Sequence, residues 1–138
     1  MKAMERAYTL GLYEKAMPSD LTWREKLLAA KEAGFDFVEI SIDETDAKLS
    51  RLDMTKEERL GLVRLMQETG VPIRTMCLSG HRKYQLGSSD PAVEERGIEI
   101  MEKAIRLQED MGHRSIQMDG SDVYYEVSTF ETEKRFLA

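Results

Sequence analysis

The sequence predicts an α/β fold built from parallel (β/α) units, and the main evidence is a joint that recurs along the chain. Three times an amphipathic helical stretch ends at a glycine and passes into a short apolar strand, over residues 33–40, 69–76 and 111–118. A further strand candidate, residues 8–13, precedes the first helix. The strands are continuous apolar runs, which is typical of a parallel sheet covered by helices. We therefore expect one domain over residues 1–138, with about four strands and three to four helices.

Local signals predict where each helix begins and ends. The first helix is expected over residues 22–33, before Gly34. The second begins with the capping box Thr55–Glu58 and ends at Gly70. The residues expected to face the core are Leu27, Leu28 and Ala30 in the first helix, and Leu60, Leu62, Val63 and Met66 in the second.

The third and fourth helices follow the same logic. Asp90 is the expected N-cap of the third helix, Pro91 is its first residue, and Gly112 ends it. A fourth helix is expected to begin near Ser128. The expected buried face of the third helix comprises Val93, Gly97, Met101, Ala104, Ile105 and Met111.

The composition excludes several classes of protein. With 138 residues, 41% hydrophobic and 33% charged, the chain resembles an ordinary soluble domain. It contains no apolar run of membrane-spanning length, and its first residues lack the apolar core of a signal peptide. The net charge of −6 argues against a nucleic-acid partner, which requires a basic face. The single cysteine, Cys77, leaves no internal disulfide, so a cytoplasmic protein without membrane or nucleic-acid partners is expected.

Two architectures fit these elements: an open doubly wound sheet and a segment of a barrel. In both, crossovers are right-handed and functional groups lie at the C-terminal ends of the strands. The segments that follow the four strands, residues 12–18, 39–44, 77–84 and 117–125, are polar or aromatic. We therefore expect the functional site at this edge of the sheet.

Four residues at these strand ends are candidates for binding a substrate. If Val38 faces the helices, the alternation of the strand turns Glu39 inward, where its carboxylate can accept hydrogen bonds from a substrate hydroxyl. Lys15, His81 and Arg82 supply cationic or titratable groups of the kind that a phosphorylated substrate requires. The alternative is structural: Glu39 paired with a neighbouring Lys or Arg, and solvated loop cations.

Three other features have more limited interpretations. Gly87, Ser88 and Ser89 precede the Asp90 cap, so backbone N–H groups at this helix start could bind an anion. Cys77 is expected to be an inward-facing small hydrophobic residue, because no histidine at motif spacing would activate it. His113 lies at a helix-to-strand joint and is interpreted as structural.

These strand ends resemble a known family. Residues 11–16, 34–46, 49–53, 76–82 and 122–125 closely resemble the L-ribulose-5-phosphate 3-epimerases, also called L-xylulose-5-phosphate 3-epimerases, of the xylose-isomerase-like TIM-barrel superfamily. The resemblance extends from about Leu10 to Phe136. Because the family's barrel is about twice this length, it implies the N-terminal half of a TIM barrel, truncated before the fifth strand.

The resemblance also implies a reaction. Family members invert C3 of a ketopentose 5-phosphate by removing the proton next to the ketone and returning it to the other face. A divalent metal stabilises the enediolate, and its four protein ligands, which include both catalytic glutamates, come from the later strands. The resemblance therefore implies no catalytic and no metal-binding residue in this chain, and no metal bound by it. It implies a substrate-binding role for Lys15, Glu39, His81 and Arg82, a phosphorylated ketose as partner, and no activity of the chain alone.

Other functions stay open at this stage. One is a non-catalytic half-barrel that forms a homo-oligomer or associates through its exposed strand edges. A related ketohexulose-6-phosphate isomerase is another, because a fold does not determine the sugar. An endonuclease of the same superfamily is disfavoured by the acidic net charge. Pentose phosphate metabolism and L-ascorbate degradation are the metabolic context that the resemblance implies.

Overall fold

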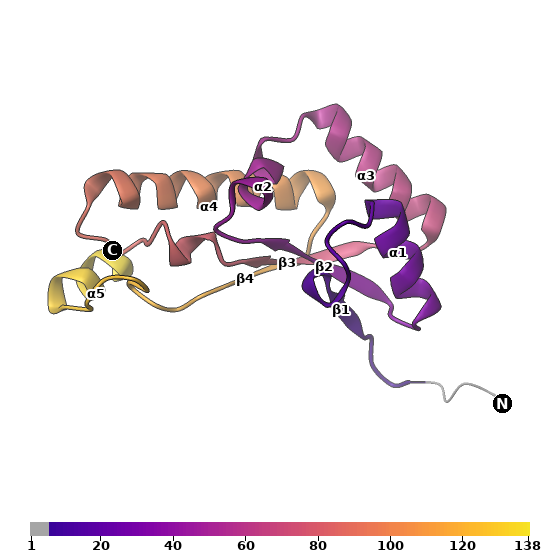
Figure 1. Cartoon of the computed structure of the whole chain (residues 1–138), viewed down its shortest axis with the longest axis horizontal. Helices are drawn as coiled ribbons and strands as arrows, with labels where there is room; N and C mark the ends of the chain where they lie inside the picture. Colours follow the sequence, from indigo (N-terminus) through magenta and orange to yellow (C-terminus); the bar gives the residue numbers. More distant parts are fainter. Residues whose placement is uncertain (1–5) are drawn as a thin grey trace.

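The computed structural model describes residues 6–138 and shows (β/α) units in succession (Figure 1). Four strands alternate with helices, and short 3-10 helices follow three of the elements. In chain order these are β1 (Gly11–Tyr13), η1 (Glu14–Ala16), α1 (Trp23–Glu32), β2 (Phe37–Ile42), α2 (Asp46–Leu49), η2 (Ser50–Asp53), α3 (Lys56–Thr69), β3 (Ile73–Leu78), η3 (Gly80–Arg82), α4 (Pro91–Met111), β4 (Ser115–Met118) and α5 (Phe130–Leu137).

The sheet topology decides between the two predicted architectures. All neighbouring strands pair in parallel, in the order β1-β2-β3-β4. Helices α1, α3 and α4 lie on the same face of the sheet, and α5 lies beside the start of α4 (Figure 1). A doubly wound sheet carries helices on both faces, whereas a barrel carries them on the outside only. The fold is thus half of a TIM barrel, as expected from the sequence.

The capping residues explain where the helices begin and end. Thr22 and Thr55 form capping boxes with Glu25 and Glu58 at the starts of α1 and α3, and Asp90 caps α4. Gly70 and Gly112 adopt the left-handed conformation that ends α3 and α4. Helix α5 begins after Thr129, close to the predicted start. The pattern did not predict α2 and η2.

A single apolar core lies between the sheet and its helices. Val38, Ile40 and Ile42 from β2 are fully buried there. Leu27 and Leu62 are buried as predicted, but Leu28, Leu60 and Ile105 are exposed, which corrects the predicted helix faces. These three side chains lie at the margin of their apolar stripes, because each helix contacts the sheet over a narrow band. The remaining buried apolar residues of this core include Ala30, Leu49, Leu52, Val71, Ile73, Met76, Leu78, Ile100, Ala104, Leu107 and Met111.

Strand alternation leaves the other face of the sheet uncovered. Phe37 and Glu39 alternate with the buried residues of β2, so they lie on the face opposite the helices, as predicted. A Cβ atom at Gly11 would approach the Phe37 ring within 2.3 Å, so Gly11 lets this ring lie against β1. We call this the inner face, after its place in a barrel.

None of the helices in residues 6–138 combines the length and apolar character that crossing a membrane requires.

Candidate functional site

The candidate site is the C-terminal edge of the sheet, where the loops after the strands meet. The Tyr125 hydroxyl, in the loop after β4, donates to the Glu44 carboxylate after β2, with an O–O distance of 2.9 Å. This hydrogen bond spans the loop after β3, which lies between these two strands in the sheet. The loops after β2, β3 and β4 therefore form one rim.

Lys15, in η1 directly after β1, extends this rim through an ion pair with Asp43, which follows β2. Its Nζ atom is 2.8 Å from Oδ2 of Asp43, and its side chain is 45% exposed to solvent. The hydrogen bond to Asp43 raises the pKa of Lys15, so the amine is charged at neutral pH. Lys15, Asp43, Lys48 and other residues line a cavity of about 360 Å³ between η1 and the start of α2. A charged amine is therefore available at the C-terminal end of β1.

Arg82 lies on the rim above the end of β3. Its guanidinium lies over the Tyr124 ring, 5.3 Å from the centroid, which restricts the side chain. Arg82 also lines a cavity of about 270 Å³, together with Cys77, Leu78, Ser79, Gln117, Met118, Asp119 and Gly120. This cavity lies where β3 and β4 end, and Arg82 supplies its positive charge.

Glu39 lies on the inner face below the rim. The Thr75 hydroxyl donates to Oε2 of Glu39 at 2.7 Å, across the β2–β3 pair. Glu39 forms no ion pair with a Lys or Arg within residues 6–138, so the predicted structural pairing is not found there. Its second carboxylate oxygen is available to accept hydrogen bonds.

Tyr13 extends this polar surface across the inner face. Its hydroxyl donates to Oγ of Ser41 at 3.2 Å. Burial is the main cause that raises the pKa of Tyr13, and hydrogen bonding to Cys77 acts in the same direction. Tyr13 is therefore neutral at physiological pH and presents a hydroxyl rather than a phenolate. Cys77 is partly exposed beside it.

Glu14 is the feature that the sequence interpretation missed. Its carboxylate, 1% exposed, accepts from Nζ of Lys26 and Lys48 at 2.7 and 2.8 Å and from both terminal nitrogens of Arg51 at 2.7 Å. The backbone N–H of Ser41 donates to it at 2.8 Å. Burial alone would raise the pKa of Glu14, but the hydrogen bonds from Arg51, Lys26 and Lys48 outweigh it and hold this pKa far below its usual range.

Glu14, Lys26, Lys48 and Arg51 form a charged cluster, which we call the Glu14 cluster. It holds the C-terminal end of β1 in place. Glu14 follows β1, Lys26 comes from α1, and Lys48 and Arg51 come from α2 and η2. The Lys26 and Arg51 cations both lie over the Trp23 ring, at 5.0 and 5.1 Å from its centroid. One carboxylate cannot neutralise three cations, so the cluster leaves excess positive charge beside Lys15. The sequence signal was a glutamate directly after an apolar strand, which indicates a buried acid but not its partners.

His81 lies elsewhere. It is buried, and its Nε2 is 2.8 Å from the carbonyl oxygen of Gly97 in α4, on the helix side of the sheet. Burial lowers the pKa of His81, so the ring is neutral at pH 7. The structure thus places Lys15, Glu39 and Arg82 at the strand ends or on the inner face, and it separates His81 from them. A substrate-binding role of His81 stays a prediction.

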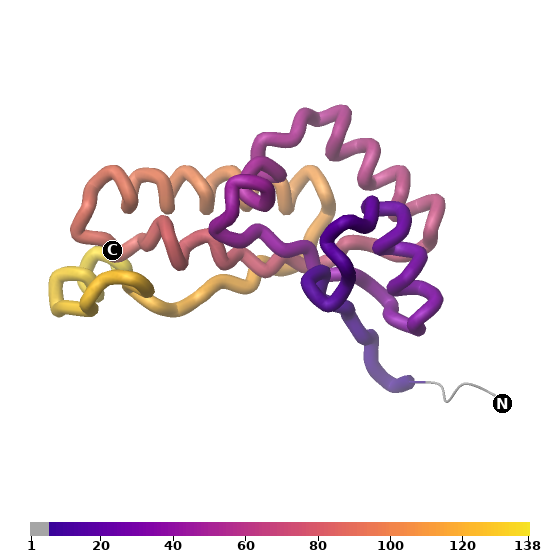
Figure 2. Tube along the Cα trace, viewed as in Figure 1, coloured from indigo at the N-terminus to yellow at the C-terminus, as the bar shows by residue number. Residues whose placement is uncertain are grey.

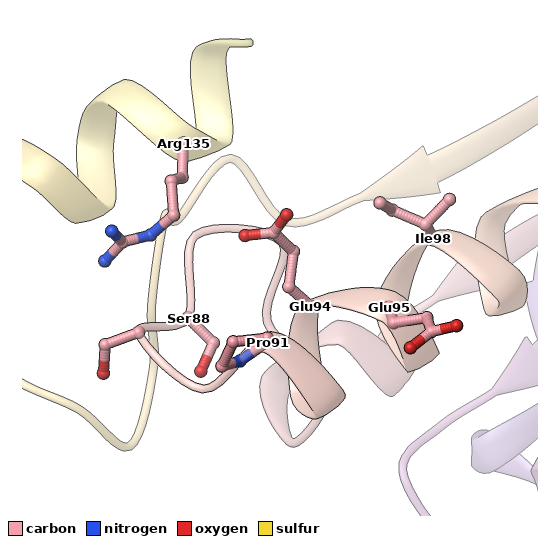
Figure 3. Close-up of a pocket in the computed structure, with 7 residues that line it drawn as sticks. Ser88, Pro91, Glu94, Glu95, Ile98 and Arg135 are labelled. Carbon is pink, nitrogen blue, oxygen red and sulfur yellow. The ribbon is translucent and has the colours of Figure 1, made fainter.

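The start of α4 already holds an anion from the chain itself. Glu126 accepts from the hydroxyl groups of Ser88 and Ser89 and from the Ser89 backbone N–H. The adjacent hollow, of about 340 Å³, lies between α4 and α5 and is lined by Ser88, Pro91, Glu94, Glu95, Ile98 and Arg135, with Ser89 (Figure 3). Two glutamates against one arginine disfavour an external anion there, which corrects the predicted anion site.

The part of the chain that the structure describes offers no candidate site for a metal ion. Within residues 6–138, no group of three or more His, Cys, Asp or Glu side chains is placed to hold an ion. These residues therefore do not supply the ligand set of the divalent metal that the resemblance implies.

Parallel strands in chain order, helices on the outer face and polar groups at the strand ends define a (β/α)-barrel protein of which this chain contains the N-terminal half. The chain belongs to the xylose isomerase-like TIM barrel family, whose model matches residues 27–138. It is 53% identical over 133 residues to proteins named L-ribulose-5-phosphate 3-epimerase UlaE from Escherichia coli and Shigella sonnei. The matches cover 96% of this chain and 47% of those proteins. The chain thus spans about half the length of these curated relatives.

Solved structures show the same fold. A D-psicose 3-epimerase determined in the presence of D-fructose matches with a TM-score of 0.74 at 14% identity, covering 94% of this chain and 45% of that one. An L-ribulose 3-epimerase matches with a TM-score of 0.65 at 22% identity, covering 92% and 41%. At these identities the likeness supports the fold alone.

Proposed function

We propose that this chain forms the substrate-binding half of an L-ribulose-5-phosphate 3-epimerase, and that it binds ketopentose 5-phosphates at the C-terminal edge of its sheet. The observation that carries this proposal is the 53% identity to proteins of that name along 96% of the chain. Carbohydrate breakdown, L-ascorbate degradation in particular, and a cytoplasmic location are part of the same proposal.

The chemistry of a ketose phosphate fits the groups on the rim. A phosphate dianion requires charged donors, and Lys15 and Arg82 supply one amine and one guanidinium. The excess charge of the Glu14 cluster raises the local positive potential. The sugar carries hydroxyl groups, and the Glu39 carboxylate accepts hydrogen bonds from such groups while Thr75 holds it in place.

The residues that are present support substrate binding but not proton transfer at C3. Inverting C3 requires one group that removes the proton next to the ketone and another that returns a proton to the opposite face. We assign neither task to a residue of this chain. Its side chains bind the phosphate and orient the sugar, so we expect binding by the 138-residue chain without exchange of the C3 proton.

Calorimetric titration with L-ribulose 5-phosphate, L-xylulose 5-phosphate and unphosphorylated L-ribulose tests the proposal. We expect binding of the phosphorylated sugars, weakened about tenfold by Lys15→Gln or Arg82→Gln, since a charge-assisted hydrogen bond contributes ~1.5–3 kcal/mol. Arg106→Gln, at an exposed position of α4, is the matched control and should bind like the unmodified chain. Equal affinity for L-ribulose and its phosphate would refute the assigned phosphate site.

Proton NMR in D₂O separates binding from catalysis. With L-xylulose 5-phosphate and Mg²⁺ or Mn²⁺, the chain should leave the C3 proton in place, while the full-length E. coli relative serves as positive control. Exchange catalysed by the chain alone would show that its own residues supply a base, contrary to the proposal.

A further inference from the structure

The loop after β4 places an aromatic ring against the Arg82 guanidinium. The chain after β4 runs beside the segment after β3 on its way to α5 (Figure 2), and the Gly87 N–H donates to the Asp122 carbonyl oxygen where the two segments meet. Two residues after Asp122, the centroid of the Tyr124 ring lies 5.3 Å from Cζ of Arg82. Because Arg82 follows β3 and Tyr124 follows β4, this contact joins two loops of the rim.

The Tyr124 ring is itself held by its neighbour in the chain. Tyr125 contacts it edge to face, with a centroid separation of 4.9 Å and an interplanar angle of 84°. The Tyr125 hydroxyl donates to the Glu44 carboxylate, which follows β2. Both tyrosines are more than half exposed, so burial in the apolar core does not account for their positions. These contacts instead form a row across the rim, from Glu44 through the two rings to Arg82.

An arginine held over an aromatic ring can still bind an anion. The ring face attracts the cation electrostatically and leaves the N–H groups of the guanidinium free to donate. Arg82 forms no ion pair with a carboxylate of residues 6–138. An unrestrained arginine loses conformational entropy when a ligand fixes it. A ring that restricts the side chain beforehand lowers this cost of binding.

We infer that Tyr124 is a positioning residue: it holds the Arg82 guanidinium in place for the phosphate group and thereby favours phosphorylated over unphosphorylated sugars. This inference rests on the proposed function, which assigns the phosphate to Lys15 and Arg82. Tyr124 acts through the face of its ring and not through its hydroxyl group. Phenylalanine at this position presents a similar face, whereas leucine presents none.

NMR titration of the 138-residue chain with L-ribulose 5-phosphate, L-ribulose and inorganic phosphate tests this inference. Tyr124→Leu should weaken binding of L-ribulose 5-phosphate about three- to tenfold, because the ligand must then immobilise Arg82 itself, and should not change the affinity for L-ribulose. Tyr124→Phe should bind like the unmodified chain.

Tyr8→Leu is the matched control. Tyr8 is an exposed tyrosine that also lies against an arginine, with Cζ of Arg6 5.9 Å from the ring centroid. It precedes β1 and therefore lies away from the C-terminal ends of the strands. Its loss should leave the binding of all three ligands unchanged. A loss of affinity equal to that of Tyr124→Leu would overturn the inference.

A double-variant cycle separates positioning from direct contact with the sugar. In an Arg82→Gln background, Tyr124→Leu should cause no further loss of affinity for L-ribulose 5-phosphate, because its effect passes through Arg82. A further loss as large as that of Tyr124→Leu alone would mean that Tyr124 contacts the ligand itself, contrary to the inference.

The chemical shifts of the Arg82 δ protons report the contact without any ligand. A ring beneath the guanidinium should move these resonances upfield in the unmodified chain and in Tyr124→Phe, and Tyr124→Leu should return them to their ordinary positions. Ordinary shifts in the unmodified chain would overturn the inference even if a variant failed to fold.

The outcomes also distinguish this inference from the proposed function. If Arg82→Gln weakens binding of L-ribulose 5-phosphate but Tyr124→Leu does not, the inference fails and the proposed function stands. If Tyr124→Leu weakens binding of inorganic phosphate, but L-ribulose 5-phosphate binds no better than inorganic phosphate, the ring positions an anion site and the proposed sugar specificity fails. If neither phosphate compound binds, both fail.

Discussion

Glu14 shows how one buried carboxylate can organise four elements. Its partners Lys26, Lys48 and Arg51 come from α1, α2 and η2, and Ser41 adds a backbone donor from β2. Removing charges from water is costly, so such a cluster is stable only when each buried group is satisfied. Glu14 is the common acceptor, and its removal leaves three cations facing one another.

Glu14→Gln should therefore destabilise the fold strongly. We expect a loss of about 3–5 kcal/mol in the free energy of unfolding, because Lys26 would stay buried without its counter-ion. Urea denaturation followed by circular dichroism measures it. The matched control is Arg24→Gln, which breaks the exposed Arg24–Glu68 pair and should cost less than about 1 kcal/mol. Equal losses for both variants would contradict a structural role of the cluster.

His113 should make the fold sensitive to mild acid. Burial lowers the pKa of His113 to about 4, and neither ring nitrogen has a hydrogen-bond partner among residues 6–138. The unfolded chain, with a histidine pKa of about 6.5, binds the proton more readily, so stability falls as the pH drops from about 6.5 towards 4. For this difference in pKa, the free energy of unfolding should fall by about 3 kcal/mol over that pH range.

Urea unfolding at several pH values checks this expectation. His113→Gln should flatten the pH dependence in that window, and an NMR titration of the ring C2 proton should report the low pKa directly. Glu14 acts at lower pH: its pKa is depressed, so its contribution is present above the usual carboxyl pKa and lost further into acid. A His113 ring that titrates near pH 6.5 in the folded chain would refute the assignment.

At the scale of elements, the segment after β4 depends on one close backbone approach. The Gly87 N–H donates to the carbonyl oxygen of Asp122 at 3.0 Å, and the Gly87 carbonyl accepts from Nε of Arg135 at 3.3 Å. The hydroxyl groups of Ser88 and Ser89 also donate hydrogen bonds to the Glu126 carboxylate, and these contacts together attach α5 to the start of α4.

Two glycine substitutions should have opposite effects. A Cβ atom at Gly87 would lie 2.6 Å from the carbonyl oxygens of both Asp122 and Thr132, and both are backbone atoms. Gly87→Ala should therefore cost about 1–3 kcal/mol and speed hydrogen exchange in α5. Gly61→Ala, in α3 with no atom within 4 Å of the new Cβ, should stabilise by about 0.5–1 kcal/mol. Unchanged exchange in α5 of Gly87→Ala would show that the segment is held elsewhere.

The contrast between local and distant interactions explains what the sequence could predict. Thr55 with Glu58, and Asp90 with Pro91, act within one helical turn, so their positions alone predicted the starts of α3 and α4. The α2–η2 segment is short and is held by Arg51 reaching Glu14, 37 residues away, which no local pattern contains. For His81 the sequence predicted the loop after β3, but packing against α4 determined which way the ring turned.

At the scale of the whole molecule, the apolar core and the candidate binding groups lie on different sides of the sheet. The helices bury one face of the sheet, while Lys15 and Arg82 lie on the rim and Glu39 on the uncovered face. Most of the apolar burial lies on the helix side of the sheet, so the packing between helices and sheet accounts for most of the hydrophobic stabilisation of the described residues.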